Sequence, residues 1–178
     1  MMAKYHWLIC GAALLIAVSA RAQSRQDPLN QLEIDQLRDT AQEPLQRLEL
    51  YIKFARLRLD AVETARTDPK VAERGQEIHD RLDDFLSVYD ELDDNVETFA
   101  DRKDDIRKVL TKVIEADTEF QAKLRALKDS ATASRAEVEK YAFVLQSSIE
   151  DVDDGVKDHR QLLSDQEEAA KHKKLIKP

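Results

Sequence analysis

A seven-residue repeat of apolar side chains runs through the centre of the chain. From Gln76 to Asp154 there is no glycine or proline, and the apolar residues recur in alternating steps of four and three. This seam comprises Ile78, Leu82, Phe85, Tyr89, Leu92, Val96, Phe99, Ile106, Leu110, Val113, Phe120, Leu124, Leu127, Val138, Tyr141, Leu145 and Val152. Such spacing places side chains on one stripe of an α-helix, which packs against a neighbouring helix. The pattern predicts an all-α protein: an elongated, antiparallel, coiled-coil-like bundle of three or four long helices plus a short N-terminal helix.

Prolines mark the expected helix starts before the seam. Asp27 and Pro28 fit the N-cap and first turn of the short N-terminal helix. Pro44 begins a longer helix, whose two adjacent apolar stripes predict contacts on two sides. The segment 67–69 (Thr-Asp-Pro) ends that helix and is expected to cap the next one in the same way.

Two charged residues interrupt the seam. Read without a break, the helix after Pro69 would extend to about Lys128, but Lys103 and Asp117 occupy positions where apolar groups are expected. An unpaired buried charge costs several kcal/mol, so each must be paired, exposed or located in a turn. We expect a turn or kink at Asp101–Asp105, and Asp117–Gln121 also matches a capping box.

A clearer boundary precedes the last helix. Residues 130–134 are small and polar, and Ser134 with Glu137 forms a capping-box pattern. The final helix is expected to extend to about Ala170. The tail 171–178 carries four lysines and is expected to be a flexible basic segment, which leaves 23–170 as a single helical domain.

The N-terminus has the layout of a secretory signal peptide. Lys4 supplies a positive charge, Leu8–Val18 is apolar or small, and small residues precede a cleavage site after Ala22. Cleavage after Ala20 is the alternative. The apolar run is too short to cross a bilayer, so an uncleaved anchor is less favoured. The sequence therefore predicts that residues 1–22 are removed, that the mature chain has no transmembrane segment, and that it is periplasmic or extracellular.

Charge and cysteine content restrict the partners of the mature chain. The full chain carries a net charge of −8, which becomes −10 when Lys4 and Arg21 are removed. Its only cysteine, Cys10, is removed as well, so the mature chain cannot form disulfides. A strongly negative protein repels phosphate backbones, which argues against nucleic acid as a partner. A protein partner or self-association is expected instead, with weak membrane contact by the basic tail as a further alternative.

Acidic residues recur every seven positions opposite the seam. This predicted acidic strip comprises Asp83, Asp84, Asp90, Glu91, Glu97, Asp104 and Asp105. A solvated outer face is the simpler interpretation. The functional alternatives are a docking surface for a basic partner or a loose site for Ca²⁺ or Mg²⁺, which bind carboxylate oxygens. Adjacent carboxylates on one helix diverge, which disfavours tight chelation by this strip alone.

The remaining candidate residues do not form a recognisable catalytic, cofactor or metal motif. The segment after Glu150 fails as an EF-hand because Val152 and Gln161 occupy ligand positions. His79, His159 and His172 are expected on the surface, and Ser148 on the seam is expected to bond its own backbone. The sequence thus predicts an exported, non-enzymatic structural or binding module that acts through a charged helical surface. The alternative is an acidic, cation-responsive helical protein.

Overall fold

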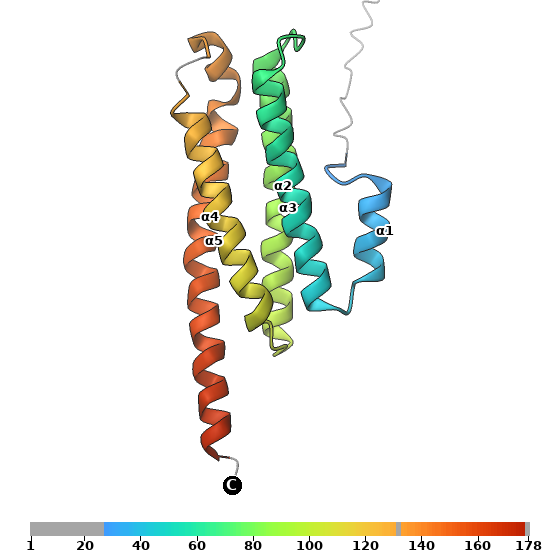
Figure 1. Cartoon of the computed structure of the whole chain (residues 1–178), viewed down its shortest axis with the longest axis vertical. Coiled ribbons are helices and arrows are strands. Elements are labelled where there is room, and N and C mark those ends of the chain that lie inside the picture. Colours follow the sequence, from blue (N-terminus) through green and yellow to red (C-terminus); the bar gives the residue numbers. More distant parts are fainter. Residues whose placement is uncertain (1–26, 131–132, 177–178) are drawn as a thin grey trace, which may run out of the picture.

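A computed structural model describes residues 27–130 and 133–176, and in these ranges the chain forms five helices and no strand (Figure 1). The helices are α1 (Gln31–Asp39), α2 (Pro44–Thr67), α3 (Arg74–Asp101), α4 (Arg107–Lys128) and α5 (Arg135–Ile176). The predicted fold class, a short N-terminal helix followed by long packed helices, is confirmed. The predicted signal segment 1–22 lies outside the described residues. Within them, no helix is both long and apolar enough to cross a membrane.

The four long helices form two antiparallel hairpins that lie side by side. Helix α2 packs against α3, and α4 packs against α5; the hairpins then meet through the pairs α2 with α4 and α3 with α5 (Figure 1). Helices α3 and α4 therefore lie at opposite corners of the bundle although a short connection joins them. Their aromatic side chains meet in the centre, where the rings of Phe85 and Phe120 lie 5.5 Å apart in an edge-to-face arrangement.

The seam forms the core, as predicted. All of its members are buried except Val138, which is half-buried. Burying a side chain of this size stabilises the fold by about 1.5–3 kcal/mol relative to leaving it exposed. Ser148 is also buried on the seam, and its hydroxyl donates to the carbonyl of Val144 at 2.8 Å, which confirms the expected backbone bond.

Two helix starts differ from the prediction. Asn30, rather than Asp27, caps α1 through a capping box with Glu33, and Asp27 instead accepts the N–H of Leu29. Helix α2 does begin at Pro44, but α3 begins at Arg74 rather than at Pro69. The carboxylate of Asp68 accepts the N–H of Lys70 at 2.9 Å, so this aspartate closes a local turn instead of capping a helix.

The expected break at Asp101–Asp105 is present. Helix α3 ends at Asp101, and Lys103 adopts a left-handed conformation with φ of 65°. The N–H of Asp104 reaches the carbonyl of Phe99, and the N–H of Lys103 reaches that of Ala100, which is the hydrogen-bond pattern of a Schellman motif. Lys103 thus lies in an exposed turn, which explains its charge on the seam.

The other predicted boundaries have different outcomes. The capping box at Asp117–Gln121 is wrong, because α4 continues through it and the hydroxyl of Thr118 bonds the carbonyl of Ile114. The boundary before α5 is confirmed, and the hydroxyl of Ser134 accepts the N–H of Glu137 at 3.2 Å. Helix α5 extends to Ile176 rather than to about Ala170, so part of the expected tail is helical, and its end extends past the α3–α4 connection (Figure 1).

Polar contacts attach α1 to the bundle. Arg58 of α2 pairs with the buried carboxylate of Glu33 at 2.5 Å and donates to the carbonyl of Pro28. Arg47 of α2 donates to the carbonyl of Leu37 at the other end of α1. Because Leu37 is the buried apolar residue of this helix, the two arginines and one leucine position the segment on α2.

Candidate functional site: a buried histidine beneath a carboxylate cluster

Three polar residues on the seam meet in the centre of the bundle. Tyr89 comes from α3, Asp117 from α4 and His159 from α5, and all three are at most 2 % exposed. The hydroxyl of Tyr89 donates to one oxygen of Asp117 at 3.1 Å. The Nδ1 of His159 lies 2.9 Å from the other oxygen of Asp117. Asp117 is therefore bonded on both sides, which satisfies the requirement that a charge on the seam be paired.

The second ring nitrogen of His159 faces outwards. Its Nε2 lies 3.0 Å from Oδ1 of Asp93, whose side chain is about half exposed at the edge between α3 and α5. The distance is that of an ion pair, but the N–H is not aligned with the carboxylate as a hydrogen bond, and the nitrogen is shielded from solvent. A continuous chain of contacts thus leads from Tyr89 through Asp117 and His159 to the surface carboxylate of Asp93.

His159 is protonated at neutral pH. Burial by itself lowers its pKa, but the hydrogen bond to Asp117 and the contact with Asp93 outweigh that effect and raise the pKa to about 9. The imidazolium therefore balances the buried charge of Asp117. Burial and the neighbouring Asp117 raise the pKa of Tyr89, which keeps its hydroxyl neutral and available as a donor.

A glycine makes room for this arrangement. A Cβ at Gly155 of α5 would lie 2.2 Å from the hydroxyl oxygen of Tyr89, far closer than atoms approach without bonding. The absence of a side chain lets the tyrosine hydroxyl reach across to Asp117. Gly155 is thus required by a close approach, not by an EF-hand loop.

The surface location predicted for His159 is wrong. This histidine lies seven residues after Val152 and therefore occupies the next position of the same apolar seam. The seam position of Asp117 was a second signal, because a buried carboxylate requires a partner of opposite charge. Extending the seven-residue repeat to polar residues would have identified Asp117 and His159 as a buried pair. It would not have shown that Asp93 and Tyr89 contact them.

The structure divides the predicted acidic strip among several surroundings. Asp84 pairs with Arg81 at 3.5 Å, and Glu91 accepts the hydroxyl of Tyr51 on α2 at 3.4 Å. Asp90 faces α5. Asp83 is half-buried, while Glu97 is exposed.

The last two members of the strip do not lie on α3 at all. Asp104 pairs with Arg102 at 3.2 Å and Asp105 with Arg107 at 2.5 Å, both in the connection after α3. The hydrogen bond from Arg107 lowers the pKa of Asp105. The seven residues therefore do not form one continuous surface, because the helix turns before the pattern ends.

Carboxylates of α3 and α5 lie near one another at the edge between these helices, and one of them, Asp93, contacts His159. We call this group, Asp90, Asp93 and Asp94 of α3 with Asp151 of α5, the carboxylate cluster. Loss of hydration raises the pKa of Asp90, and the charges of Asp151, Asp94 and Asp93 raise it further. The pKa of Asp151 is raised in the same way, by loss of hydration and then by Asp154, Glu150 and Asp93. Both side chains are exposed, so the cluster holds mutually repelling charges at the surface.

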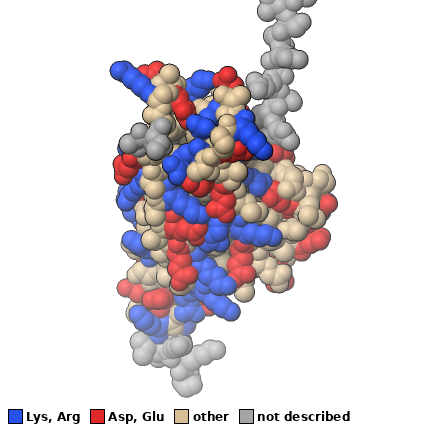
Figure 2. Space-filling view, turned by 45° about the horizontal axis from the view of Figure 1, so that its top comes forward, with Lys and Arg blue, Asp and Glu red and all other residues tan. Residues whose placement is uncertain are grey.

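Several other charged residues of the bundle form ion pairs. Figure 2 shows basic and acidic side chains interleaved over one face of the molecule. Asp154, next to the cluster on α5, pairs with Lys157 at 2.7 Å, and Asp153 pairs with Arg125 of α4 at 2.8 Å. In the described ranges, no group of three or more histidine, cysteine, aspartate or glutamate side chains converges closely enough to hold a metal ion.

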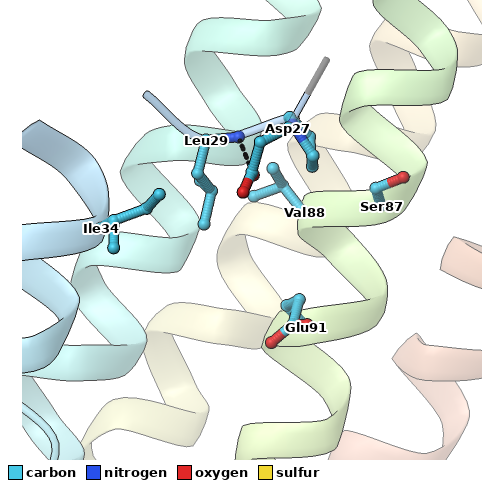
Figure 3. Close-up of a pocket in the computed structure, with 7 residues that line it drawn as sticks. Asp27, Leu29, Ile34, Ser87, Val88 and Glu91 are labelled. Atoms are coloured by element: carbon cyan, nitrogen blue, oxygen red, sulfur yellow. Dashed lines mark hydrogen bonds between the residues drawn. The ribbon is translucent and has the colours of Figure 1, made fainter. Parts of the chain in front are cut away.

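A surface pocket lies on the other side of α3. It has a volume of about 480 Å³ and is lined by Asp27, Pro28, Leu29, Ile34, Ser87, Val88 and Glu91 (Figure 3). Its apolar side chains come from α1, from the segment before it and from α3. The carboxylate of Asp27 is occupied by the N–H of Leu29 at 3.0 Å, and Glu91 accepts from Tyr51. The pocket does not include His159 or Asp117, so the polar residues of the core do not open into it.

Comparisons with known proteins give no relatives. No protein-family model, curated protein or solved structure matches the chain.

Proposed function

We propose that the protein is a non-enzymatic helical binding module whose carboxylate cluster binds a basic surface of a protein partner. The observation that carries this proposal is the placement of carboxylates on two adjacent helices, α3 and α5, close enough that, after loss of hydration, their charges raise the pKa of both Asp90 and Asp151. Positive side chains of a partner would relieve this repulsion and form charge-assisted hydrogen bonds. Of the predicted acidic strip, only Asp90 belongs to this cluster; its other members, Asp93, Asp94 and Asp151, were not part of the prediction.

The proposal is non-enzymatic because the most unusual chemical groups are closed to substrates. Asp117 and His159 are almost fully buried, and Nδ1 of His159 and both oxygens of Asp117 are already bonded within the protein. A substrate would reach them only if the helices separated. Their arrangement supports a role in holding α3, α4 and α5 together beneath the binding surface.

Binding of a labelled oligoarginine peptide tests the proposal. Fluorescence anisotropy should show saturable binding at low salt that weakens as salt is added, because ion pairs at the surface are screened. The variant Asp90→Asn/Asp151→Asn should bind several-fold more weakly. The control Asp39→Asn/Asp129→Asn removes the same charge from exposed residues of α1 and of the end of α4. Equal loss of affinity in both variants would mean that only net charge matters.

A cation-responsive role is the second candidate, and the same crowded carboxylates favour it. Ca²⁺ or Mg²⁺ binds carboxylate oxygens, so either ion would also relieve the repulsion at the cluster. A partner with separated charges fits better, because in the described ranges no three ligands converge on one point. Millimolar Ca²⁺ that raises the melting temperature more than matched ionic strength would favour the cation role.

We also propose that the protein is exported, as its first 22 residues predict. The intact mass of the protein recovered from expressing cells tests this, because cleavage after Ala22 leaves Gln23 as the first residue. Recovery of the uncleaved chain would contradict export by this route.

Sedimentation of the mature chain at low salt tests self-association, in which the basic end of α5 in a second copy would be the partner.

A further inference from the structure

We infer that His159 regulates the carboxylate cluster: its imidazolium competes with a basic partner for Asp93, so that loss of the histidine proton strengthens partner binding. The inference rests on the proposed function, because it concerns the affinity of that same surface. It follows from the position of one buried ring between a core carboxylate and a surface carboxylate.

The contacts of His159 make the competition specific. Its Nε2 is shielded from water and lies 3.0 Å from Asp93, yet forms no aligned hydrogen bond there. The carboxylate of Asp93 is half exposed, so a partner approaches it from the solvent while the imidazolium contacts it from the core. One carboxylate thus lies between two cations when a partner binds, and each cation weakens the attraction of the other.

The other side of the ring is fixed. Nδ1 of His159 contacts Asp117 of α4 at 2.9 Å, and the second oxygen of Asp117 accepts from Tyr89 of α3. The ionisable groups in contact with the ring are therefore Asp93 from α3 and Asp117 from α4, and Tyr89 of α3 bonds the second of these. Tyr89 stays neutral because its pKa is raised by burial. When the imidazolium loses its proton, Asp93 is left without its nearest positive charge and becomes a stronger acceptor for a partner.

Thermodynamic linkage gives the direction of the effect. A basic partner disfavours the protonated form of His159, so binding releases a proton and tightens as the pH rises through the pKa of His159, about 9. If the partner lowers this pKa by one unit, affinity rises roughly tenfold between about pH 7 and about pH 10. Deprotonation in the absence of a partner weakens the fold, so the measurement must include a check that the helices persist.

The test is the affinity of the same oligoarginine peptide as a function of pH, because arginine keeps its charge throughout this range. The wild-type chain should show the roughly tenfold rise, whereas His159→Gln should show a flat profile. Circular dichroism at each pH confirms that both chains remain helical. The conservative change His79→Gln provides the matched control, since His79 is partly exposed on α3 and contacts Asp80; it should behave as the wild type.

A second readout follows the histidine directly. The NMR resonances of the His159 ring, identified by their absence in His159→Gln, should titrate at a lower pH when the peptide is present. If the peptide binds but neither the affinity nor the ring titration responds, the regulatory inference is overturned and the binding proposal stands. If the peptide does not bind at any pH, the binding proposal itself fails.

Discussion

The α2–α4 edge and the α3–α5 edge of the bundle have a similar helix arrangement but differ in how their charged side chains are paired. On the α2–α4 edge, Lys112 meets Glu49, Arg56 meets Glu119 at 2.8 Å, and Lys123 meets Asp60 at 2.8 Å. The α3–α5 edge has the pair Lys140 with Glu73 at 2.8 Å at its start, and further along it carboxylates on both helices whose basic neighbour is the buried His159, in contact with Asp93.

The difference shows that one bundle can have one edge with ion pairs across it and another edge whose carboxylates are only partly paired. The three ion pairs across the α2–α4 edge satisfy these charges within the chain, so they offer little to a partner. On the α3–α5 edge, His159 contacts the carboxylate of Asp93 from the core and balances only part of the negative charge there. The exposed pairs of the first edge contribute little to stability. Removing one partner of the buried pair Asp117–His159 costs far more, because the other charge is then left out of water without a partner.

Removing Asp117 should give the largest effect and the sharpest test of this contrast. Asp117→Ala leaves the imidazolium of His159 and the hydroxyl of Tyr89 without their buried acceptor. We expect a loss of about 3–5 kcal/mol in the free energy of unfolding. Glu119→Ala, two residues along the same helix, should cost no more than about 1 kcal/mol because its ion pair is exposed. Urea denaturation measures both, and similar losses would refute the distinction between the edges.

The stability of the fold should fall at alkaline pH. The pKa of His159 in the folded chain is about 9, above the value of about 6.5 for an unfolded histidine. Its contribution is therefore complete below about pH 6.5 and is lost as the pH rises through about 9, a change of roughly 3 kcal/mol. Urea denaturation across this range should show the decline in the wild type. A decline of the same size in His159→Gln would assign it to other groups.

Filling the space at Gly155 should break the contact between Tyr89 and Asp117. Alanine favours a helix over glycine by about 1 kcal/mol, yet Gly155→Ala should destabilise the protein by about 2 kcal/mol because the new methyl group displaces the tyrosine hydroxyl. In a Tyr89→Phe background, which lacks that hydroxyl, the same change should cost less. A double-mutant cycle measures the difference, and additive losses would show that the clash is elsewhere.

Replacing carboxylates by amides on the two edges should change the free energy of unfolding in opposite directions. These are the smallest of the effects that we expect. Folding raises the pKa of Asp90 and Asp151, so their charged forms disfavour the fold at neutral pH. Asp90→Asn/Asp151→Asn should therefore stabilise the protein, by about 0.5 kcal/mol after screening by solvent. Asp60→Asn/Glu119→Gln on the other edge should destabilise it slightly, because both side chains lose cationic partners. Thermal unfolding at matched salt compares the two, and a shift of the same sign would contradict the contrast.

Much of the fold could be predicted from local patterns in the sequence, but only part of the candidate site could. The seam, the turn near Lys103 and the start of α2 at Pro44 were predictable because periodicity and backbone preferences act over a few residues. Position 117 was recognised as an anomaly, but the sequence could not identify its partner. His159 is 42 residues away along the chain, and its distance from Asp117 depends on how α4 and α5 pack.

The sequence by itself determined that this protein is a set of amphipathic helices with a surplus of acid on their outer faces. Only the tertiary structure decided which of those acids are neutralised. It places α3 and α4 at opposite corners, brings α3 beside α5, and so sets Asp90 and Asp93 against Asp151 while Asp60 and Glu119 meet basic residues. The physical reason is that helix formation depends on neighbours three and four residues apart, whereas the energy of a charge depends on every group within a few ångströms, wherever that group lies in the chain.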